Sequence, residues 1–269
     1  MKFGVPLVAV RPDAWGDVAA VADEVGFESI WIADHLVFPV RMEGELSPGE
    51  EHPPVPPTVP VYDPTAYLCY LAARTTRVRL GVYVYLAALR HPFTFARAFT
   101  TLDAVSGGRA EVGVGAGWLR NEWTAAGFDP ATRGRRLDEA LEVSIRLWTE
   151  DTVEHHGEFY DFEEVAFEPK PVQRPHPPVL VGGESPAAIR RAARYQGWMG
   201  MVHTPESAAP LAAQLPDHIE VTVSGECSSA DDLRRWEDAG VDRLVVRPWR
   251  RTADAVAGIQ RFAERFVHP

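Results

Sequence analysis

The sequence is poor in lysine and in basic charge overall, and this shortage excludes a class of protein. Lysine occurs only at Lys2 and Lys170, and 27 basic residues face 38 acidic ones, which gives a net charge of −11. A chain this acidic is not expected to bind nucleic acid, because phosphate contacts need a basic surface. It can still bind an anion locally, through backbone amides and a few arginines.

Cysteine and long apolar runs are also scarce. The two cysteines, Cys69 and Cys227, lie far apart and form no C-x-x-C pair, so neither a disulfide framework nor a zinc site is predicted. This usage fits a reducing compartment, and we expect a cytoplasmic protein. No stretch reaches 18 apolar residues, so no membrane span is predicted. The first apolar run is broken by Pro6 and Arg11, which indicates a first strand and not a signal peptide.

What the sequence does have is an alternation of short apolar strands with amphipathic helices. We predict strands at residues 2–8, 29–33, 77–86, 109–117, 177–183, 198–202, 218–224 and 243–248. We predict helices at residues 14–25, 64–75, 93–106, 135–150, 185–196, 205–215, 229–240 and 252–267. Eight such units, with strands apolar on both faces, predict a single α/β domain over residues 1–269, a (β/α)8 TIM barrel. A doubly wound open sheet would more often carry a glycine-rich fingerprint after its first strand, and none is present.

Two segments interrupt this alternation. Residues 36–63, after the second strand, hold many prolines and no periodicity, which predicts a long surface loop. Loops of this length are usually functional or disordered. Residues 151–176, after the fourth helix, form a second, polar excursion. It contains His155 and His156, but no third ligand stands at a useful spacing, so no metal site is predicted.

In a TIM barrel the functional site lies at the C-terminal ends of the strands. The second predicted strand ends there on Asp34 and His35. A histidine moves protons near neutral pH, and a neighbouring carboxylate can orient its ring. Outside a barrel, the same pair would more simply be a polar strand end in which Asp34 braces a loop. No G-x-S-x-G motif is present, so covalent hydrolysis is not favoured.

The fourth and fifth predicted strands run into glycines, at residues 115–118 and 182–185. Glycine allows a backbone to approach a ligand closely, and the second stretch is followed at once by a helix start, which suits an anion. Paired glycines that only make tight turns would give the same pattern, so the spacing alone leaves both readings open.

Taken together, six stretches resemble the luciferase-like oxidoreductases, in the branch that uses coenzyme F420, a deazaflavin. They are GFESIWIADHLVFP, DPTAYLCYLAARTTRVRLGVYVYLAALRHP, TLDAVSGGRAEVGVGAGWLRNEW, RGRRLDEALEVSIRLW, HGEFYDFEEVAFEPKPVQ and PPVLVGGESPAAIRRAAR. The resemblance runs along nearly the whole chain, in order and spacing. It implies a barrel that holds the cofactor over its C-terminal mouth, a small-molecule substrate and, commonly, a homodimer.

The resemblance also implies roles for individual residues. His35 would be the catalytic proton donor or acceptor, with Asp34 orienting it, and a bulge with a non-proline cis peptide would lie at Tyr83-Val84. The implied cofactor-binding residues are Asp34, His35, Tyr83, Val84, Gly115, Ala116, Gly117, Trp118, Gly182, Gly183, Glu184 and Ser185. The expected substrate pocket is Phe38, Tyr85 and Trp118. Strand alternation would place Tyr83 and Tyr85 on one face.

One departure from the family bears on the substrate. The sugar-phosphate dehydrogenases of this family have an acid after the glycines of the fourth strand, where this chain has Trp118. The basic residues that grip the sugar phosphate have no clear counterparts either, so a sugar-phosphate substrate is not expected. The sequence predicts F420-dependent hydride transfer to or from a small organic molecule that it does not identify. The alternatives are an FMN-dependent monooxygenase and a catalytically idle flavin- or deazaflavin-binding barrel.

Overall fold

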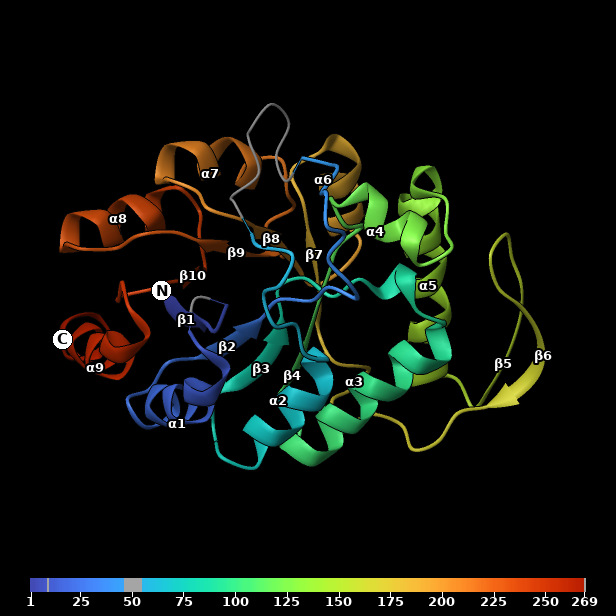
Figure 1. The fold of residues 1–269 in the computed structure, drawn as a ribbon, viewed down its shortest axis with the longest axis horizontal. Helices are drawn as coiled ribbons and strands as arrows, with labels where there is room; N and C mark the ends of the chain where they lie inside the picture. Colours follow the sequence, from blue (N-terminus) through green and yellow to red (C-terminus); the bar gives the residue numbers. More distant parts are fainter. Residues whose placement is uncertain (9, 46–54, 269) are drawn as a thin grey trace.

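Eight parallel strands close into a barrel, with helices around it (Figure 1). The structure, a computed structural model, describes residues 1–8, 10–45 and 55–268. Around the barrel the strands follow the order β1-β10-β9-β8-β7-β4-β3-β2. The TIM-barrel prediction is therefore confirmed. The barrel strands are β1 (Lys2–Pro6), β2 (Ser29–Ile32), β3 (Arg79–Val82), β4 (Ala110–Val114), β7 (Val179–Gly182), β8 (Gly197–Gly200), β9 (Glu220–Ser224) and β10 (Arg243–Val245).

All of the predicted helices are present, with ends that differ by a few residues. They are α1 (Trp15–Glu24), α2 (Pro64–Ala72), α3 (Pro92–Ser106), α5 (Arg133–Thr149), α6 (Pro186–Ala192), α7 (Pro205–Ala212), α8 (Ala230–Asp238) and α9 (Ala255–Phe266). Short 3-10 turns are η1 (Pro12–Ala14), η2 (Ala87–Leu89), η3 (Pro130–Thr132) and η4 (Thr252–Asp254). Within the described part of the chain, no helix has the length and apolarity needed to cross a bilayer.

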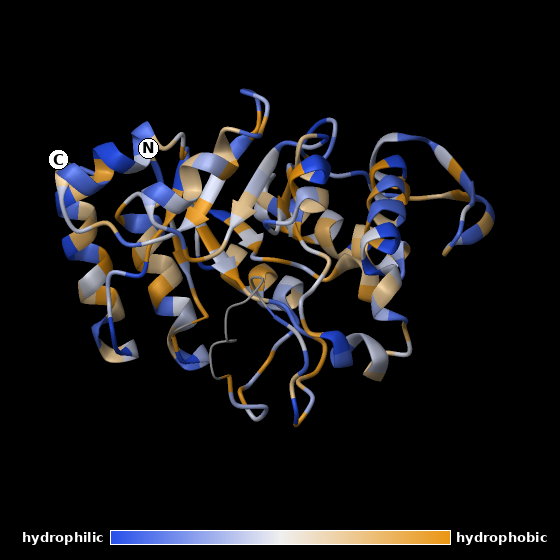
Figure 2. Ribbon diagram, turned by 90° about the horizontal axis from the view of Figure 1, so that it is seen from above, coloured by the Kyte–Doolittle hydropathy of each residue, from blue (hydrophilic) through white to orange (hydrophobic). Residues whose placement is uncertain are grey.

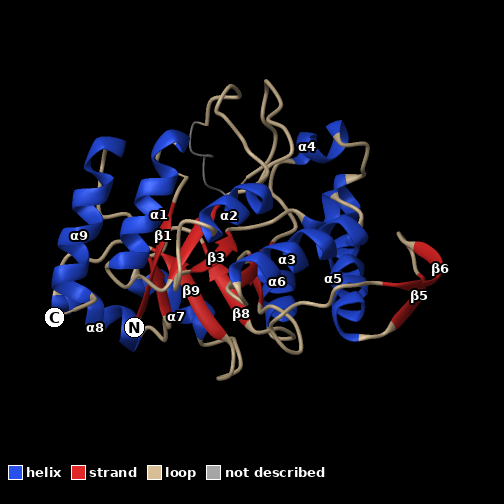
Figure 3. Cartoon of the chain, turned by 90° about the horizontal axis from the view of Figure 1, so that it is seen from below, coloured by secondary structure: helices blue, strands red, loops and turns tan. Residues whose placement is uncertain are grey.

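Two elements were not predicted. One is α4 (Arg120–Ala125), a six-residue helix whose N-terminal residue makes no side-chain capping bond, so it has no strong sequence signal. The other is an antiparallel hairpin of β5 (Thr152–His156) and β6 (Asp161–Ala166), which replaces most of the polar excursion predicted at 151–176. The hairpin lies outside the barrel beside α5 (Figure 3).

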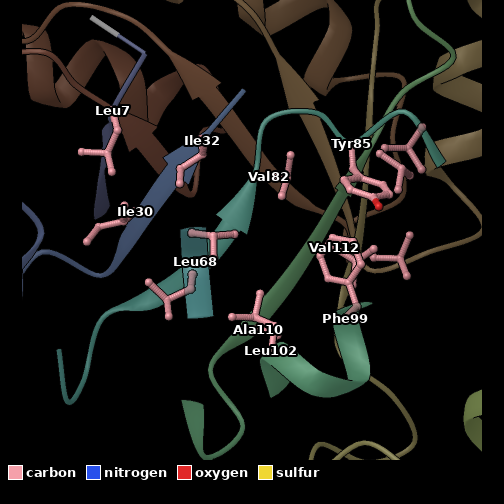
Figure 4. Close-up of a cluster of buried hydrophobic side chains, with 14 of the residues drawn as sticks. Leu7, Ile30, Ile32, Leu68, Val82, Tyr85, Phe99, Leu102, Ala110 and Val112 are labelled. Carbon is pink, nitrogen blue, oxygen red and sulfur yellow. The ribbon is translucent and has the colours of Figure 1, made fainter. Parts of the chain in front are cut away.

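The buried side chains form two layers, and β2 shows how alternation separates them. Ile30 and Ile32 belong to the large cluster between barrel and helices, where Leu68 of α2 also packs (Figure 4). Trp31, between them, packs with Leu180 and Met199 in a separate small cluster. The apolar residues concentrate along the central strands, and the outer helices carry many hydrophilic ones (Figure 2). The strands are thus buried on both faces, as parallel strands in a barrel should be.

The N-terminal end of the barrel contains a buried ion-pair network centred on Arg243. Its guanidinium donates to both carboxylate oxygens of Glu111, at 2.7 and 3.0 Å, and pairs with Glu28 at 2.8 Å and Glu220 at 2.7 Å. Arg79 makes a further ion pair with Glu111. Burial alone would lower the pKa of Arg243, but the surrounding carboxylates raise it above its usual value. Three carboxylates thus share Arg243, with Arg79 as a second cation at Glu111 and Lys2 at Glu220. Burial, together with the neighbouring carboxylates, raises the pKa of Glu28 above its usual value.

Candidate functional site

The chain after β2 carries Asp34 into a buried ion pair at the C-terminal end of the barrel. Arg90 donates to both carboxylate oxygens of Asp34, at 2.7 and 2.9 Å, and the Leu86 amide donates a third bond at 2.9 Å. The Arg90 guanidinium also lies over the Tyr85 ring, 4.2 Å from its centroid. Burial alone would lower the pKa of Arg90, but Asp34 raises it above its usual value, so the pair stays charged. Asp34 therefore fastens the end of β2 to the segment after β3.

His35 is held by a different carboxylate, that of Glu122 in α4. The His35 Nδ1 lies 2.9 Å from Glu122 Oε2, and the other oxygen of Glu122 accepts from the Leu36 and Val37 amides, at 2.6 and 3.3 Å. The Glu122 side chain is 1% exposed and that of His35 is 16% exposed. Among the described residues, only Nδ1 of the ring makes a hydrogen bond. The other ring nitrogen, Nε2, is left available.

The expectation that Asp34 orients His35 is therefore wrong. Asp34 is occupied by Arg90, and the residue that fixes the His35 ring is Glu122, 87 positions away in sequence. The available signal was an acid in the loop that follows the glycine turn of β4, four residues beyond Trp118. This signal was weak because, without a predicted helix at α4, nothing in the sequence indicated where the Glu122 side chain would lie.

Aromatic side chains surround the His35 ring. Phe38 lies 4.4 Å away and Trp118 5.9 Å away, measured between ring centroids. Both residues were expected in the substrate pocket, and the structure brings them together at His35. Tyr85, the third expected member, is a correction: it is 1% exposed and packs on Phe95 and Phe99 of α3, between barrel and helices (Figure 4).

The peptide between Tyr83 and Val84 is cis, as the family resemblance implied. Tyr83 packs against Trp31 at a centroid distance of 5.8 Å, and burial raises its pKa above the usual value. The Val84 side chain lies between two of the glycines singled out in the sequence. A Cβ at Gly115 would come within 2.4 Å of Val84, and one at Gly182 within 2.6 Å. These glycines therefore make room for Val84, a reason that their spacing did not suggest.

The turn after β7 combines backbone freedom with a helix start. Gly183 has a φ of +114° and its carbonyl accepts from the Trp198 indole at 2.8 Å. The Ser185 hydroxyl accepts from the Ala188 amide at 3.2 Å and so caps α6, as its position predicted. Glu184 pairs with His203 at 3.2 Å. Glu184 and Ser185 are thus engaged with their own chain, and the turn can offer backbone groups to a ligand.

The long segment after β2 is fastened to the same small helix that holds His35. Asn121 accepts from the Glu43 amide at 3.2 Å and donates to the Arg41 carbonyl, and the Arg120 amide donates to the Glu43 carbonyl at 2.7 Å. The described parts of the predicted loop 36–63 contain neither helix nor strand, and residues 46–54 lie outside the described chain.

Most of the exposed large apolar side chains belong to segments that follow a barrel strand. Among the described residues, those that follow β1, β2 or β8 are Val8, Leu36, Val37, Val40, Val59, Val61, Tyr62, Met201 and Val202. Elsewhere the exposed large apolar residues are Tyr70, Val105 and Val172. In the same described residues, no group of three or more histidine, cysteine or acidic side chains is placed to hold a metal ion.

Comparison with known proteins places this geometry in a family. Residues 3–243 match the luciferase-like monooxygenase family. An uncharacterized protein of Mycobacterium tuberculosis is 33% identical over 263 residues, which cover 93% of this chain and 92% of that protein. The F420-dependent glucose-6-phosphate dehydrogenase of Kineococcus radiotolerans is 33% identical over 199 residues, 72% of this chain and 54% of the dehydrogenase.

A shorter stretch resembles a flavin enzyme, and the fold resembles a deazaflavin enzyme. Over 110 residues the chain is 38% identical to the FMNH2-dependent dimethylsulfone monooxygenase of Pseudomonas putida, which covers 40% of this chain and 30% of that enzyme. The F420-dependent tetrahydromethanopterin reductase of Methanopyrus kandleri shares the fold, with a TM-score of 0.78 and 17% identity over 99% of this chain and 98% of that one. The two relatives named here by their activity are oxidoreductases, one dependent on F420 and one on FMNH2, and the protein belongs to the luciferase-like monooxygenase family.

Proposed function

We propose that this protein is a coenzyme F420-dependent oxidoreductase in which His35 donates or accepts the proton that accompanies hydride transfer to a small organic substrate. The observation that carries the proposal is the half-held His35 ring: Glu122 fixes Nδ1 at 2.9 Å, and Nε2 has no partner among the described residues. A histidine held at one nitrogen has a defined orientation and a free nitrogen for proton transfer. It stands at the C-terminal ends of the strands, where barrel enzymes have their sites.

The residues present fit a flat aromatic cofactor. Tyr83 and Val84 pack on the buried Trp31, Leu180 and Met199 and form an apolar support inside the barrel. The turn at 182–185 supplies backbone groups, and Gly183 with its positive φ has no side chain in the way. When bound, the deazaflavin supplies a ring carbon that gives or takes the hydride, and the protein supplies orientation and proton transfer.

The protein's own part in the reaction follows from the contacts of His35. Glu122 accepts a hydrogen bond from the Nδ1–H group. The ring therefore presents Nε2 as a base when it is neutral and as an N–H acid when it is protonated. Phe38 and Trp118 pack around the ring and would keep water from it. The Asp34 carboxylate fixes the segment after β3 instead, through Arg90 and the Leu86 amide.

The test begins with titration of the purified protein with F420 and, separately, with FMN. Tight F420 binding is expected, whereas tight FMN binding without F420 binding would replace the proposal with an FMN-dependent monooxygenase. This alternative is favoured by the stretch that resembles the dimethylsulfone monooxygenase. Binding without turnover across a broad set of enones, imines and alcohols would instead indicate an idle barrel.

The role of His35 is tested by substitution with F420 saturating. His35→Ala is expected to reduce hydride transfer by about 10²-fold or more, because general acid–base help is lost. The matched control is His268→Ala, which removes an exposed histidine beside the Val25 carbonyl, near the end of the chain. Unchanged turnover in the His35 variant would overturn the assignment.

A further inference from the structure

We propose that the β5–β6 hairpin positions the Arg90–Asp34 pair at the mouth of the barrel, and that Glu139 of α5 fixes the turn of the hairpin, beside the contacts that Arg135, Arg136 and Arg146 of the same helix make with it. The hairpin lies outside the barrel, and its strands pair only with each other. The proposal depends on the proposed function for its kinetic readout alone, since its structural readout needs neither cofactor nor substrate.

The first step is the attachment of the hairpin turn to α5. The Glu139 carboxylate accepts from the Phe159 amide at 3.0 and 3.1 Å, from the Tyr160 amide at 2.9 Å, and lies 3.1 Å from His155 Nε2. The Glu139 side chain is 11% exposed, so these bonds are largely shielded from water. Hydrogen bonds to a charged, mostly buried acceptor are among the stronger ones in proteins.

Gly157 at the turn indicates that the chain is shaped around this carboxylate. A Cβ at Gly157 would lie 2.1 Å from Glu139 Oε1 and 2.4 Å from His155 Nε2. A side chain at this position would therefore displace the carboxylate from the turn. The backbone of Gly157 has no positive φ, so its small size, and not its conformation, is what the contact requires.

The second step is the packing of the hairpin on the chain that follows β3. The Tyr160 hydroxyl donates to the Arg90 carbonyl at 3.5 Å, a long bond, and the Tyr160 ring meets His91 edge to face at 5.5 Å. Further along β6, Phe162 packs on Phe93 at 4.7 Å. The hairpin thus contacts the carbonyl of residue 90 and the two aromatic rings that follow it.

The third step leads from Arg90 into the site. The Arg90 side chain binds both oxygens of Asp34, and the Leu86 amide binds the same carboxylate. Residues 86–90 are therefore fixed at one end by Asp34 and at the other by the hairpin. Tyr85 separates them from Tyr83-Val84, which pack on the apolar cluster of the barrel interior. A shift of the hairpin would therefore displace residues 86–91 first.

An isolated two-stranded hairpin is marginally stable in water. The contacts of this hairpin with α5 and with residues 90–93 hold it against the barrel. Loss of the Glu139 hydrogen bonds should therefore loosen the turn without unfolding the barrel. Glu142 provides a matched control, because it is an exposed acid one turn further along α5, with no hydrogen bond among those of the described residues. Glu139 is in this sense a positioning residue, acting through Tyr160 and Arg90.

The structural test is hydrogen–deuterium exchange of the full-length protein, without ligand, for the wild type, Glu139→Ala and Glu142→Ala. In the Glu139 variant we expect exchange about tenfold faster in residues 156–162 and also in 86–91, with β9 and β10 unchanged. The Glu142 variant should match the wild type. Faster exchange confined to the hairpin would overturn the proposal, because the hairpin would then be uncoupled from residue 90.

Gly157→Ala is the second variant. It leaves Glu139 in the sequence, but the added methyl group displaces the Glu139 carboxylate from the turn. It should reproduce the Glu139 exchange pattern, whereas a pattern like the wild type would overturn the role given to the turn. With F420 saturating, both variants should lower kcat several-fold with little change in KM. If the exchange coupling is seen and no F420 binds, the positioning network stands and the proposed function fails. If F420 turnover is normal in all variants, positioning of the site is refuted and the proposed function stands.

Discussion

The two ends of the barrel both bury charged side chains, but they leave them in different states. At the N-terminal end, Arg243 is surrounded by Glu28, Glu111 and Glu220 and forms an ion pair with each of them, so that its guanidinium is engaged inside the cluster. At the C-terminal end, Glu122 is just as buried, yet the histidine that it holds is hydrogen-bonded through only one ring nitrogen within the described part of the chain. A closed network is suited to stability, and a network left open at one atom is suited to chemistry. This agrees with the general division of labour in TIM barrels.

The largest effect, a loss of stability, is expected from a change in the Arg243 network at the N-terminal end of the barrel. Arg243→Met removes the cation that three carboxylates share and should lower the free energy of unfolding by about 3–5 kcal/mol, because the buried Glu111 keeps Arg79 alone and the partly buried Glu28 loses its arginine. Urea unfolding measures the loss. F420 affinity should stay near that of the wild type at temperatures where the variant is folded. An equal loss of affinity would mean that the two ends are not separate in function.

The corresponding change at the open end is Glu122→Gln. A glutamine can still accept from the Leu36 amide, but its NH2 group would face His35 Nδ1 and favour the wrong tautomer of the ring. We expect turnover to fall by ~10²-fold, the scale of general acid–base help, with a stability loss smaller than that of the Arg243 variant. The pH profile of kcat with F420 saturating should shift or flatten. A large stability loss with an unchanged profile would assign Glu122 a structural role only.

A smaller effect is expected at Asp23, which joins α1 to the turn before β3. Its carboxylate accepts from the amides of Thr76, Arg77 and Val78 at 2.6–2.9 Å. Burial alone would raise the pKa of Asp23, but these amides bring it below its usual value. A lowered pKa means stability that is present above the unfolded pKa of about 4 and is lost as pH falls through the folded value.

Asp23→Asn should therefore cost about 1–3 kcal/mol at pH 7, the range for a buried hydrogen-bonded acceptor. The variant should also lose less stability than the wild type between pH 5 and the acid transition, as measured by urea unfolding at several pH values. Asp17→Asn is the control, since that acid is exposed and its ion pair with Arg74 is at the surface. A parallel pH dependence in wild type and Asp23→Asn would contradict the assignment.

The same contrast explains what the sequence could and could not predict. The barrel followed from the apolar strands and from helix starts such as Asp63-Pro64 and Ser185-Pro186, which are local signals and are confirmed. The position of His35 followed from the fold. Its partner did not, because Glu122 lies 87 residues away on a helix of six residues without a capping side chain. A contact between residues so far apart in the chain produces no periodic pattern in the sequence.

The misplaced Tyr85 has an equally physical reason. Strand alternation put it on the same face as Tyr83, but β3 ends at Val82, so both tyrosines lie beyond the regular strand. The alternation of one strand no longer applies there. Tyr83 packs with the barrel interior and Tyr85 with α3. A period-2 argument is reliable only while the strand is regular.

The smallest effect, a change in KM, is expected when an exposed apolar residue at the mouth is replaced and compared with one elsewhere. Val37 follows His35 and is 48% exposed, whereas Val105 on α3 is 56% exposed and far from any strand end that carries the site. If the mouth binds a neutral, apolar substrate, Val37→Asp should raise KM for a cyclic ketone about fivefold, the cost of losing one buried aliphatic contact of ~1 kcal/mol. Val105→Asp should leave KM unchanged, and both variants should unfold in urea almost as the wild type does, because neither valine is buried. Equal KM values in the two variants would show that the exposed apolar residues at the mouth do not contact the substrate, and the search for it would then move to polar molecules held by the 182–185 turn.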